Sequence, residues 1–278
     1  MKYAVDTSIQ GTYSNPKLIG NLAVLAEHSG WDGFFIWDSI GGEEPIADPW
    51  VTLSVIASVT EKIRIGTAVT PIARRRPWKL ARETVSVDNL SSGRLTLGVG
   101  LGTSPTTEYE RFGEDPDTRI LARKLDEGLD VLTGLWSGKE FSYLGDHYRI
   151  DRATFLPKPI QSPRIPIWVG ANWPNKRPLR RAAQWDGVYP IYWHEGENKM
   201  SPTILKDIVK YVGEHKNNSR DFDVVAAGTH DVSKRSQLAQ LAKAYSDIGA
   251  TWYASPIGPH IGDVNAVKAW ISLGPPKY

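Results

Sequence analysis

The sequence predicts a single α/β domain with the architecture of a (β/α)8, or TIM, barrel and a small hairpin inserted before the fifth strand. Eight short β-rich runs alternate with longer amphipathic runs, which is typical of a parallel sheet wrapped by helices. The length of 278 residues suits one such barrel. An open, doubly wound sheet would carry a Gly-x-Gly-x-x-Gly turn after its first strand, where this chain has Asp6-Thr7-Ser8.

Capping residues define the helices in the first half of the chain. Asn15 stands directly before Pro16, a pair typical of a helix start. Pro77 opens another helix that runs to Leu90, and Gly93 follows at a position where a left-handed cap favours glycine. With a further helix from about residue 48, the strands of this half are expected at residues 2–7, 33–38, 63–69 and 95–100.

A long amphipathic helix and a hairpin separate the fourth strand from the fifth. Leu125, Leu129, Leu132 and Trp136 form one apolar stripe of that helix, and residues 141–151 alternate around a glycine as a surface hairpin does. The remaining strands are expected at residues 165–170, 187–192, 222–228 and 250–254, with helices ending near residue 183 and spanning 202–215, 233–248 and 264–272.

Composition excludes several classes of function. The chain has no cysteine, which excludes disulfides, thiol catalysis and thiolate metal sites. Its net charge of +2 is far from the basic surface of a nucleic-acid-binding protein. The polar start, MKYAVDTSIQG, lacks the apolar stretch of a signal peptide, and no apolar run approaches about 18 residues. We therefore expect a cytoplasmic protein that binds neither nucleic acid nor membrane.

The residues that follow the strands form the candidate site, because barrel enzymes carry their chemistry at the C-terminal ends of the strands. Tryptophans there either fill the core or form the walls of a pocket for a flat ligand. Core packing is favoured for Trp168 and Trp252. The expected substrate pocket comprises Asp6, Trp37, Ser39, Thr103, Trp173, Trp193 and His194.

The segment from Gly170 to Arg177 joins the fifth strand to its helix and is expected to bind a phosphate. Free N–H groups at a helix start and the adjacent Lys176 and Arg177 attract an anion, the alternative being a solvated basic helix start. The glycines between residues 98 and 102 either admit a ligand to the backbone or form a tight turn.

The arginine run at residues 74–76 and the single Arg94 are not expected to bind a ligand. The run Arg74-Arg75-Arg76 is expected to be a solvated loop rather than an anion-steering patch. Arg94 begins the fourth strand at the opposite face of the barrel, where we expect a structural residue paired with Asp88.

Histidines follow three of the later strands, where they could be metal ligands or a catalytic base. They are His194, His230 and His260. A barrel hydrolase would usually carry paired histidines on its first strand, and neither these nor a His-Glu-x-x-His motif is present. The sequence therefore predicts no metal site.

Several segments together resemble the bacterial luciferase-like superfamily of flavin- and deazaflavin-dependent (β/α)8 enzymes. Residues 60–69 (TEKIRIGTAV) are followed by Pro77, and residues 90–100 (LSSGRLTLGVG) run into the fourth strand. The resemblance covers roughly residues 1–195 in order. It implies one barrel domain over residues 1–278, a cofactor ring in the barrel mouth and a homodimer.

The resemblance also implies where the cofactor would lie. Ala68 and Val69 fall where the family often has a bulge with a non-proline cis peptide against the ring, and Gly100 and Leu101 line the ring or the chain leading to the phosphate. The phosphate itself would lie against Gly170, Ala171 and Asn172, with Lys176 or Arg177.

Two departures affect proton handling. Ser39 replaces a histidine that many members carry, and Thr103 replaces the acid of the deazaflavin-dependent sugar dehydrogenases. By position, Asp38 and His230 are the candidate catalytic residues, although Asp38 could instead anchor its loop and His230 could cap a helix.

The resemblance implies an oxidoreductase that acts on a small, partly apolar organic substrate. The cofactor would be F420, which transfers hydride, or reduced FMN, which oxygenates with O2 and would need a flavin reductase as partner. A luciferase-type arginine is missing near Leu101, which slightly favours F420. The alternatives are a non-catalytic flavin-binding barrel and, less favoured, a metal-dependent barrel hydrolase.

Overall fold

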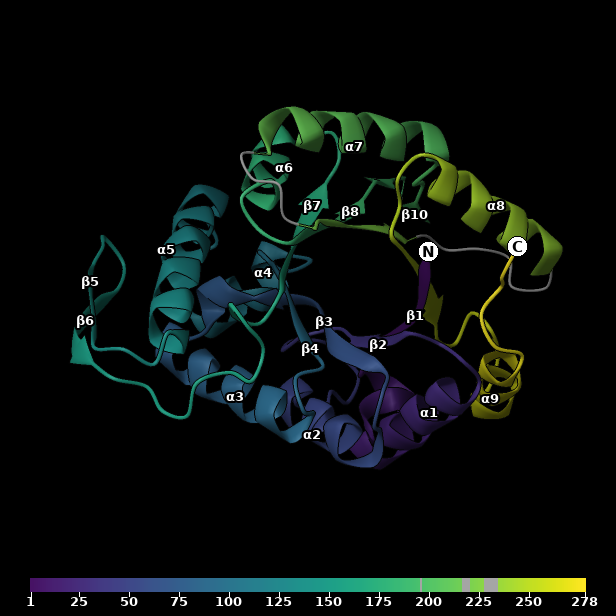
Figure 1. The fold of residues 1–278 in the computed structure, drawn as a ribbon, viewed down its shortest axis with the longest axis horizontal. Coiled ribbons are helices and arrows are strands. Elements are labelled where there is room, and N and C mark those ends of the chain that lie inside the picture. The colour runs from purple at the N-terminus through teal and green to yellow at the C-terminus, as the bar shows by residue number, and fades with distance from the viewer. Residues whose placement is uncertain (196, 217–220, 228–234) are drawn as a thin grey trace.

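Eight parallel strands close into a barrel in the order β1-β12-β11-β8-β7-β4-β3-β2, which confirms the predicted fold class (Figure 1). The computed structural model describes residues 1–195, 197–216, 221–227 and 235–278. The barrel strands are β1 (Lys2–Thr7), β2 (Gly33–Ile36), β3 (Arg64–Pro71), β4 (Leu95–Gly100), β7 (Ile167–Asn172), β8 (Gly187–Ile191), β11 (Asp223–Ala227) and β12 (Trp252–Ile257).

Helices surround the barrel on its outside (Figure 1). Their starts follow local capping: the Asn15 side chain accepts from the N–H groups of Lys17 and Leu18, directly before Pro16. The outer helices are α1 (Pro16–His28), α2 (Pro49–Val59), α3 (Pro77–Leu90), α5 (Thr118–Trp136), α6 (Lys176–Ala182), α7 (Pro202–His215), α8 (Arg235–Asp247) and α9 (Val264–Ser272).

The predicted hairpin is present as strands β5 (Phe141–Leu144) and β6 (Arg149–Ala153), which pair antiparallel and lie outside α5 (Figure 1). Several short segments in the loops were not predicted, because they are too short to carry a hydrophobic period. They are η1 (Gly11–Ser14), η2 (Ile72–Arg74), α4 (Pro105–Glu108), η3 (Glu110–Phe112), β9 (Trp193–His194) and β10 (Glu197–Asn198).

Aromatic rings fill the barrel interior. Trp168 is 1% exposed, and its ring centroid lies 5.0 Å from that of Phe35 and 5.4 Å from that of Trp252. Glycine makes room for these rings, since a Cβ at Gly187 would come within 2.5 Å of the Trp168 ring. The core packing that was favoured for Trp168 and Trp252 is confirmed. The interior of the barrel is therefore filled by side chains.

Arg94 at the opposite face is structural, as predicted, but its expected pairing with Asp88 is wrong. The Arg94 guanidinium donates to the carbonyl oxygens of Ala57 and Thr60, which terminate α2. Asp88 instead accepts the backbone N–H of Ile160 at 2.8 Å.

No helix within the described part of the chain combines the length and apolar character needed to cross a membrane.

Candidate functional site

Strand β3 forms a bulge at the C-terminal end of the barrel, which we call the mouth. Its pairing with β4 shifts register between Thr67 and Thr70, and the Ala68–Val69 peptide bond is cis. Both features lie at the residues that the resemblance indicated. Ala68 and Val69 are half-buried, whereas Thr67 and Thr70 on either side are buried. The bulge thus exposes small apolar side chains in the middle of an otherwise buried strand.

Val69 occupies space left by glycines on β4 and on the next strand of the barrel, β7. A Cβ at Gly100 would lie 2.6 Å from Val69 Cγ2, and one at Gly170 would lie 3.3 Å from both Val69 methyl groups. These two glycines therefore accommodate Val69, and their contact with a cofactor stays a prediction. Leu101, the next residue, is half-buried and packs against the core.

Asp6 lies at the end of β1 and receives two hydrogen bonds from other strands. The Trp37 indole N–H donates to Oδ1 at 2.9 Å, and the Tyr189 hydroxyl donates to Oδ2 at 2.7 Å. Trp37 directly follows β2, whereas Tyr189 reaches Asp6 from β8, three strands away around the barrel. Asp6 is 6% exposed, and burial raises its pKa to about 7, although both hydrogen bonds act to lower that pKa.

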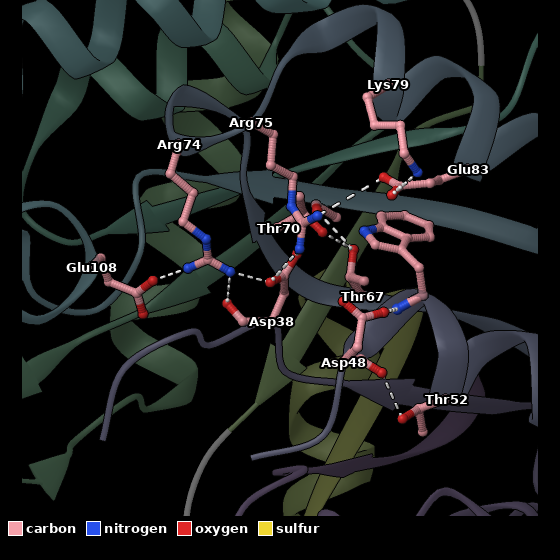
Figure 2. A network of polar contacts seen from close by, with 12 residues as sticks. Asp38, Asp48, Thr52, Thr67, Thr70, Arg74, Arg75, Lys79, Glu83 and Glu108 are labelled. Carbon is pink, nitrogen blue, oxygen red and sulfur yellow. Dashed lines mark hydrogen bonds and ion pairs between the residues drawn. The ribbon is translucent and has the colours of Figure 1, made fainter. Parts of the chain in front are cut away.

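Asp38 is the centre of a buried ionic network (Figure 2). Arg75 donates to both of its carboxylate oxygens, at 2.8 and 2.9 Å, and Arg74 donates to Oδ1. Arg74 also forms an ion pair with Glu108 of α4. The side chain of Asp38 is fully buried and that of Arg74 is 5% exposed. The expectation of a solvated arginine loop is therefore wrong for Arg74 and Arg75.

This network connects the loops that follow three consecutive strands. Asp38 follows β2, Arg74 and Arg75 follow β3, and Glu108 follows β4. Because guanidinium groups engage both oxygens of Asp38, the geometry supports the anchoring role for Asp38 over proton exchange.

The residues proposed to hold a phosphate lie at the junction of β7 and α6. Gly170, Ala171 and Asn172 are the last residues of β7, and Lys176 is the first of α6. The Lys176 ammonium lies 3.7 Å from the ring centroid of Trp173 and 4.5 Å from that of Tyr211. Arg177 and Asn172 are exposed, so their polar groups are accessible at the mouth.

The expected substrate-pocket residues differ in exposure. Trp37 is 40% and Trp193 57% exposed, and His194 on the same short strand stacks against Tyr192 with centroids 5.7 Å apart. Ser39 is half-buried and Thr103 exposed. Exposed aromatic rings thus lie at the mouth, as predicted. Their contact with a substrate stays a prediction.

His230 lies outside the described residues. The described His260 accepts or donates one hydrogen bond with the Pro256 carbonyl, at 3.1 Å from Nε2. Among the described residues, no group of three or more His, Cys, Asp and Glu side chains is arranged to hold a metal ion.

Two residues of the site were missed from the sequence. Tyr189 sits within the strand expected at residues 187–192, at an inward position that the alternation of side chains could have indicated. Glu108 gave no usable signal, because it lies on a helix of four residues.

Residues 3–255 match the family model of the luciferase-like monooxygenases. The chain belongs to the luciferase-like monooxygenase family. The match extends from β1 into β12, and so includes the last third of the barrel, where the sequence showed only the alternation of elements.

Individual luciferase-like relatives act with different cofactors. An F420-dependent glucose-6-phosphate dehydrogenase of Nakamurella multipartita is 32% identical over 166 residues, which are 57% of this chain and 48% of that protein. The oxygenase component of a flavin-dependent trigonelline monooxygenase of Acinetobacter baylyi is 32% identical over 128 residues, covering 46% of this chain and 35% of that protein. This chain therefore spans about half the length, or less, of these relatives.

Among solved structures, an F420-dependent secondary alcohol dehydrogenase in complex with an F420–acetone adduct superimposes with a TM-score of 0.78. The alignment covers 100% of this chain and 99% of the other at 17% identity, so it supports the fold alone.

Proposed function

We propose that this chain is an F420-dependent oxidoreductase that moves hydride between the deazaflavin and a small, partly apolar alcohol or carbonyl compound. The observation that carries the proposal is the accessible apolar floor of the mouth. Ala68 on β3 and Ile191 on β8 both pack on the aromatic interior, yet both remain partly exposed. A flat, uncharged ring system fits such a floor better than a polar ligand does.

The residues around this floor fit the rest of the cofactor. Ala68, Val69, Gly100 and Leu101 would face the ring and its side chain, and Gly170 to Asn172 with Lys176 or Arg177 would face the phosphate. A bound deazaflavin supplies a site that accepts or returns hydride. The protein's own contribution is to position the reactants and to exclude water, for which the exposed rings of Trp37 and Trp193 are suitably placed.

The choice of F420 over FMN is supported by the sequence relatives. The dehydrogenase matched over 57% of this chain uses F420, as its name states, whereas the flavin-dependent oxygenase is matched over 46%. That second match is what favours the alternative proposal, an FMN-dependent monooxygenase supplied by a separate flavin reductase.

Anaerobic mixing experiments distinguish the two. The protein is mixed with F420 and isopropanol, cyclohexanol or benzyl alcohol, and in the reverse direction with reduced F420 and acetone, cyclohexanone or benzaldehyde. The proposal predicts a change in cofactor absorbance without oxygen. Oxygenated product formed only with reduced FMN and O2 would support the monooxygenase, and inactivity in both assays would contradict both proposals.

The expected homodimer, the flavin reductase and the cytoplasmic location stay predictions. They derive from the resemblance and from composition, and each is open to direct measurement.

A further inference from the structure

We infer that Asp6 is the group that exchanges a proton with the substrate, with Tyr189 and Trp37 as the residues that position it; this inference rests on the proposed function. Asp6 is the last inward-facing residue of β1 before the strand ends at Thr7, at the end of the barrel where the apolar floor lies. Below it, the interior is filled by Phe35, Trp168 and Trp252.

Asp6 differs from the other buried aspartate of the mouth in having neutral partners. Asp38 is neutralised by Arg74 and Arg75, whereas the described partners of Asp6 are the indole of Trp37 and the phenol of Tyr189. Within the described part of the chain, no cation forms an ion pair with Asp6. A buried carboxylate without a cation binds a proton readily, because its charge is poorly solvated.

The described groups packed around Asp6 are uncharged. In the parallel register, β2 places Phe35 beside it and β12 places Pro256, while β8 supplies Tyr189. Burial is accordingly the largest cause of its raised pKa, which at about 7 lets both protonation states be populated near neutral pH. Residues 228–234, which follow β11, are outside the described part.

The hydrogen-bond geometry allows the proton to be held and passed on. Ionised Asp6 accepts both hydrogen bonds, whereas protonated Asp6 can donate to the Tyr189 oxygen, since a phenol both donates and accepts. In alcohol oxidation, a deazaflavin bound in the mouth would take the hydride, with its two electrons, from the carbinol carbon, and Asp6 would take the hydroxyl proton. In carbonyl reduction, Asp6 would return that proton and the reduced deazaflavin would return the hydride.

The first test reads the protonation of Asp6 without cofactor. Protein labelled with 13C at the aspartate side-chain carboxyl is titrated by NMR, and the Asp6→Asn variant identifies the Asp6 signal by its loss. We expect a midpoint near pH 7 and a higher midpoint in Tyr189→Phe, because that change removes a donor that favours the charged form. A midpoint in the ordinary range near pH 4 would overturn the inference.

The second test measures the hydride-transfer step with F420 and whichever alcohol wild type oxidises. Asp6→Asn should bind F420 within about threefold of wild type and slow transfer by at least about 100-fold, with loss of the pH dependence near neutrality. Asp130→Asn is the matched control. Asp130 also accepts from a tyrosine hydroxyl, that of Tyr143 at 3.4 Å, but lies on the outer helix α5, and its rate should be unchanged.

The outcomes separate this inference from the proposed function. Wild type that binds or turns over no F420 contradicts the proposed function, and the role of Asp6 falls with it. Wild type that turns over while Asp6→Asn keeps the full rate overturns the role of Asp6 alone.

Discussion

Val69 fills the space that a side chain at Gly100 would need: a Cβ at position 100 would come within 2.6 Å of Val69 Cγ2. Gly100→Ala should therefore destabilise the fold by roughly 1–3 kcal/mol through overpacking. Urea denaturation measures this loss. Combining it with Val69→Ala should recover a large part, because the truncated side chain vacates the contested space.

A second glycine provides the comparison for this prediction. Gly213 lies within α7, and a Cβ there would meet no described heavy atom within 4 Å beyond its own stretch of helix. Gly213→Ala should stabilise the protein by about 0.5–1 kcal/mol, through the higher helix propensity of alanine. Equal losses at both positions would refute steric exclusion by Val69.

Arg74 holds two buried carboxylates together, those of Asp38 and Glu108 (Figure 2). Arg74→Met should lower the free energy of unfolding by roughly 3–5 kcal/mol, because it leaves Glu108 without its cation in a buried position. Lys243→Met, which removes an exposed pair with Asp247, should leave the free energy of unfolding nearly unchanged, because water screens that pair. Similar small effects for both variants would show that the network contributes little to stability.

A substitution at Arg94 tests whether the end of the barrel opposite the mouth contributes to stability but not to cofactor binding. The Arg94 guanidinium caps carbonyl groups at the end of α2, so Arg94→Met should destabilise by roughly 2–4 kcal/mol. Because Arg94 precedes β4 at the end opposite the mouth, the dissociation constant for F420 should stay unchanged in protein that remains folded. Calorimetric binding beside thermal unfolding measures both. Weakened binding in the folded variant would contradict this separation.

Asp6 makes the stability of the protein depend on pH. Burial raises its pKa from the ordinary 3.8 to about 7, so between these values the folded chain binds more protons than the unfolded chain. The free energy of unfolding contributed by this group therefore falls as the pH rises through that window, by up to about 4 kcal/mol. Below pH 4 the group has no such effect.

The difference in the free energy of unfolding between Asp6→Asn and wild type isolates the contribution of Asp6. Urea denaturation at pH 4 to 8 should show the variant gaining relative stability as the pH rises toward 7 and levelling off above it. A difference that does not vary with pH would contradict the raised pKa of Asp6.

The positions of the main elements could be predicted because their signals are local. Pro77–Leu90, Pro202–His215 and Val264–Ser272 begin and end where capping residues and apolar spacing placed them. The two-residue strand at Trp193 has no such period, and its pairing with Glu197–Asn198 depends on the loop's own path.

The site could be predicted only in part. The sequence placed Asp6 at a strand end, but its partner Tyr189 is 183 residues away and meets it only when the barrel closes. In the same way, the arginine run indicated positive charge but not its partners. Arg74 pairs with the carboxylates of Asp38 and Glu108, which follow other strands. Which side chains contact each other across the mouth is determined only when the barrel closes.

The most direct test of the proposed function is a side-by-side titration of the protein with F420 and with FMN, followed by fluorescence. We predict saturable binding of F420, with FMN at least about tenfold weaker, a difference of about 1.4 kcal/mol. Tighter binding of FMN, or binding of neither, would contradict a deazaflavin-dependent hydride transfer at this barrel mouth.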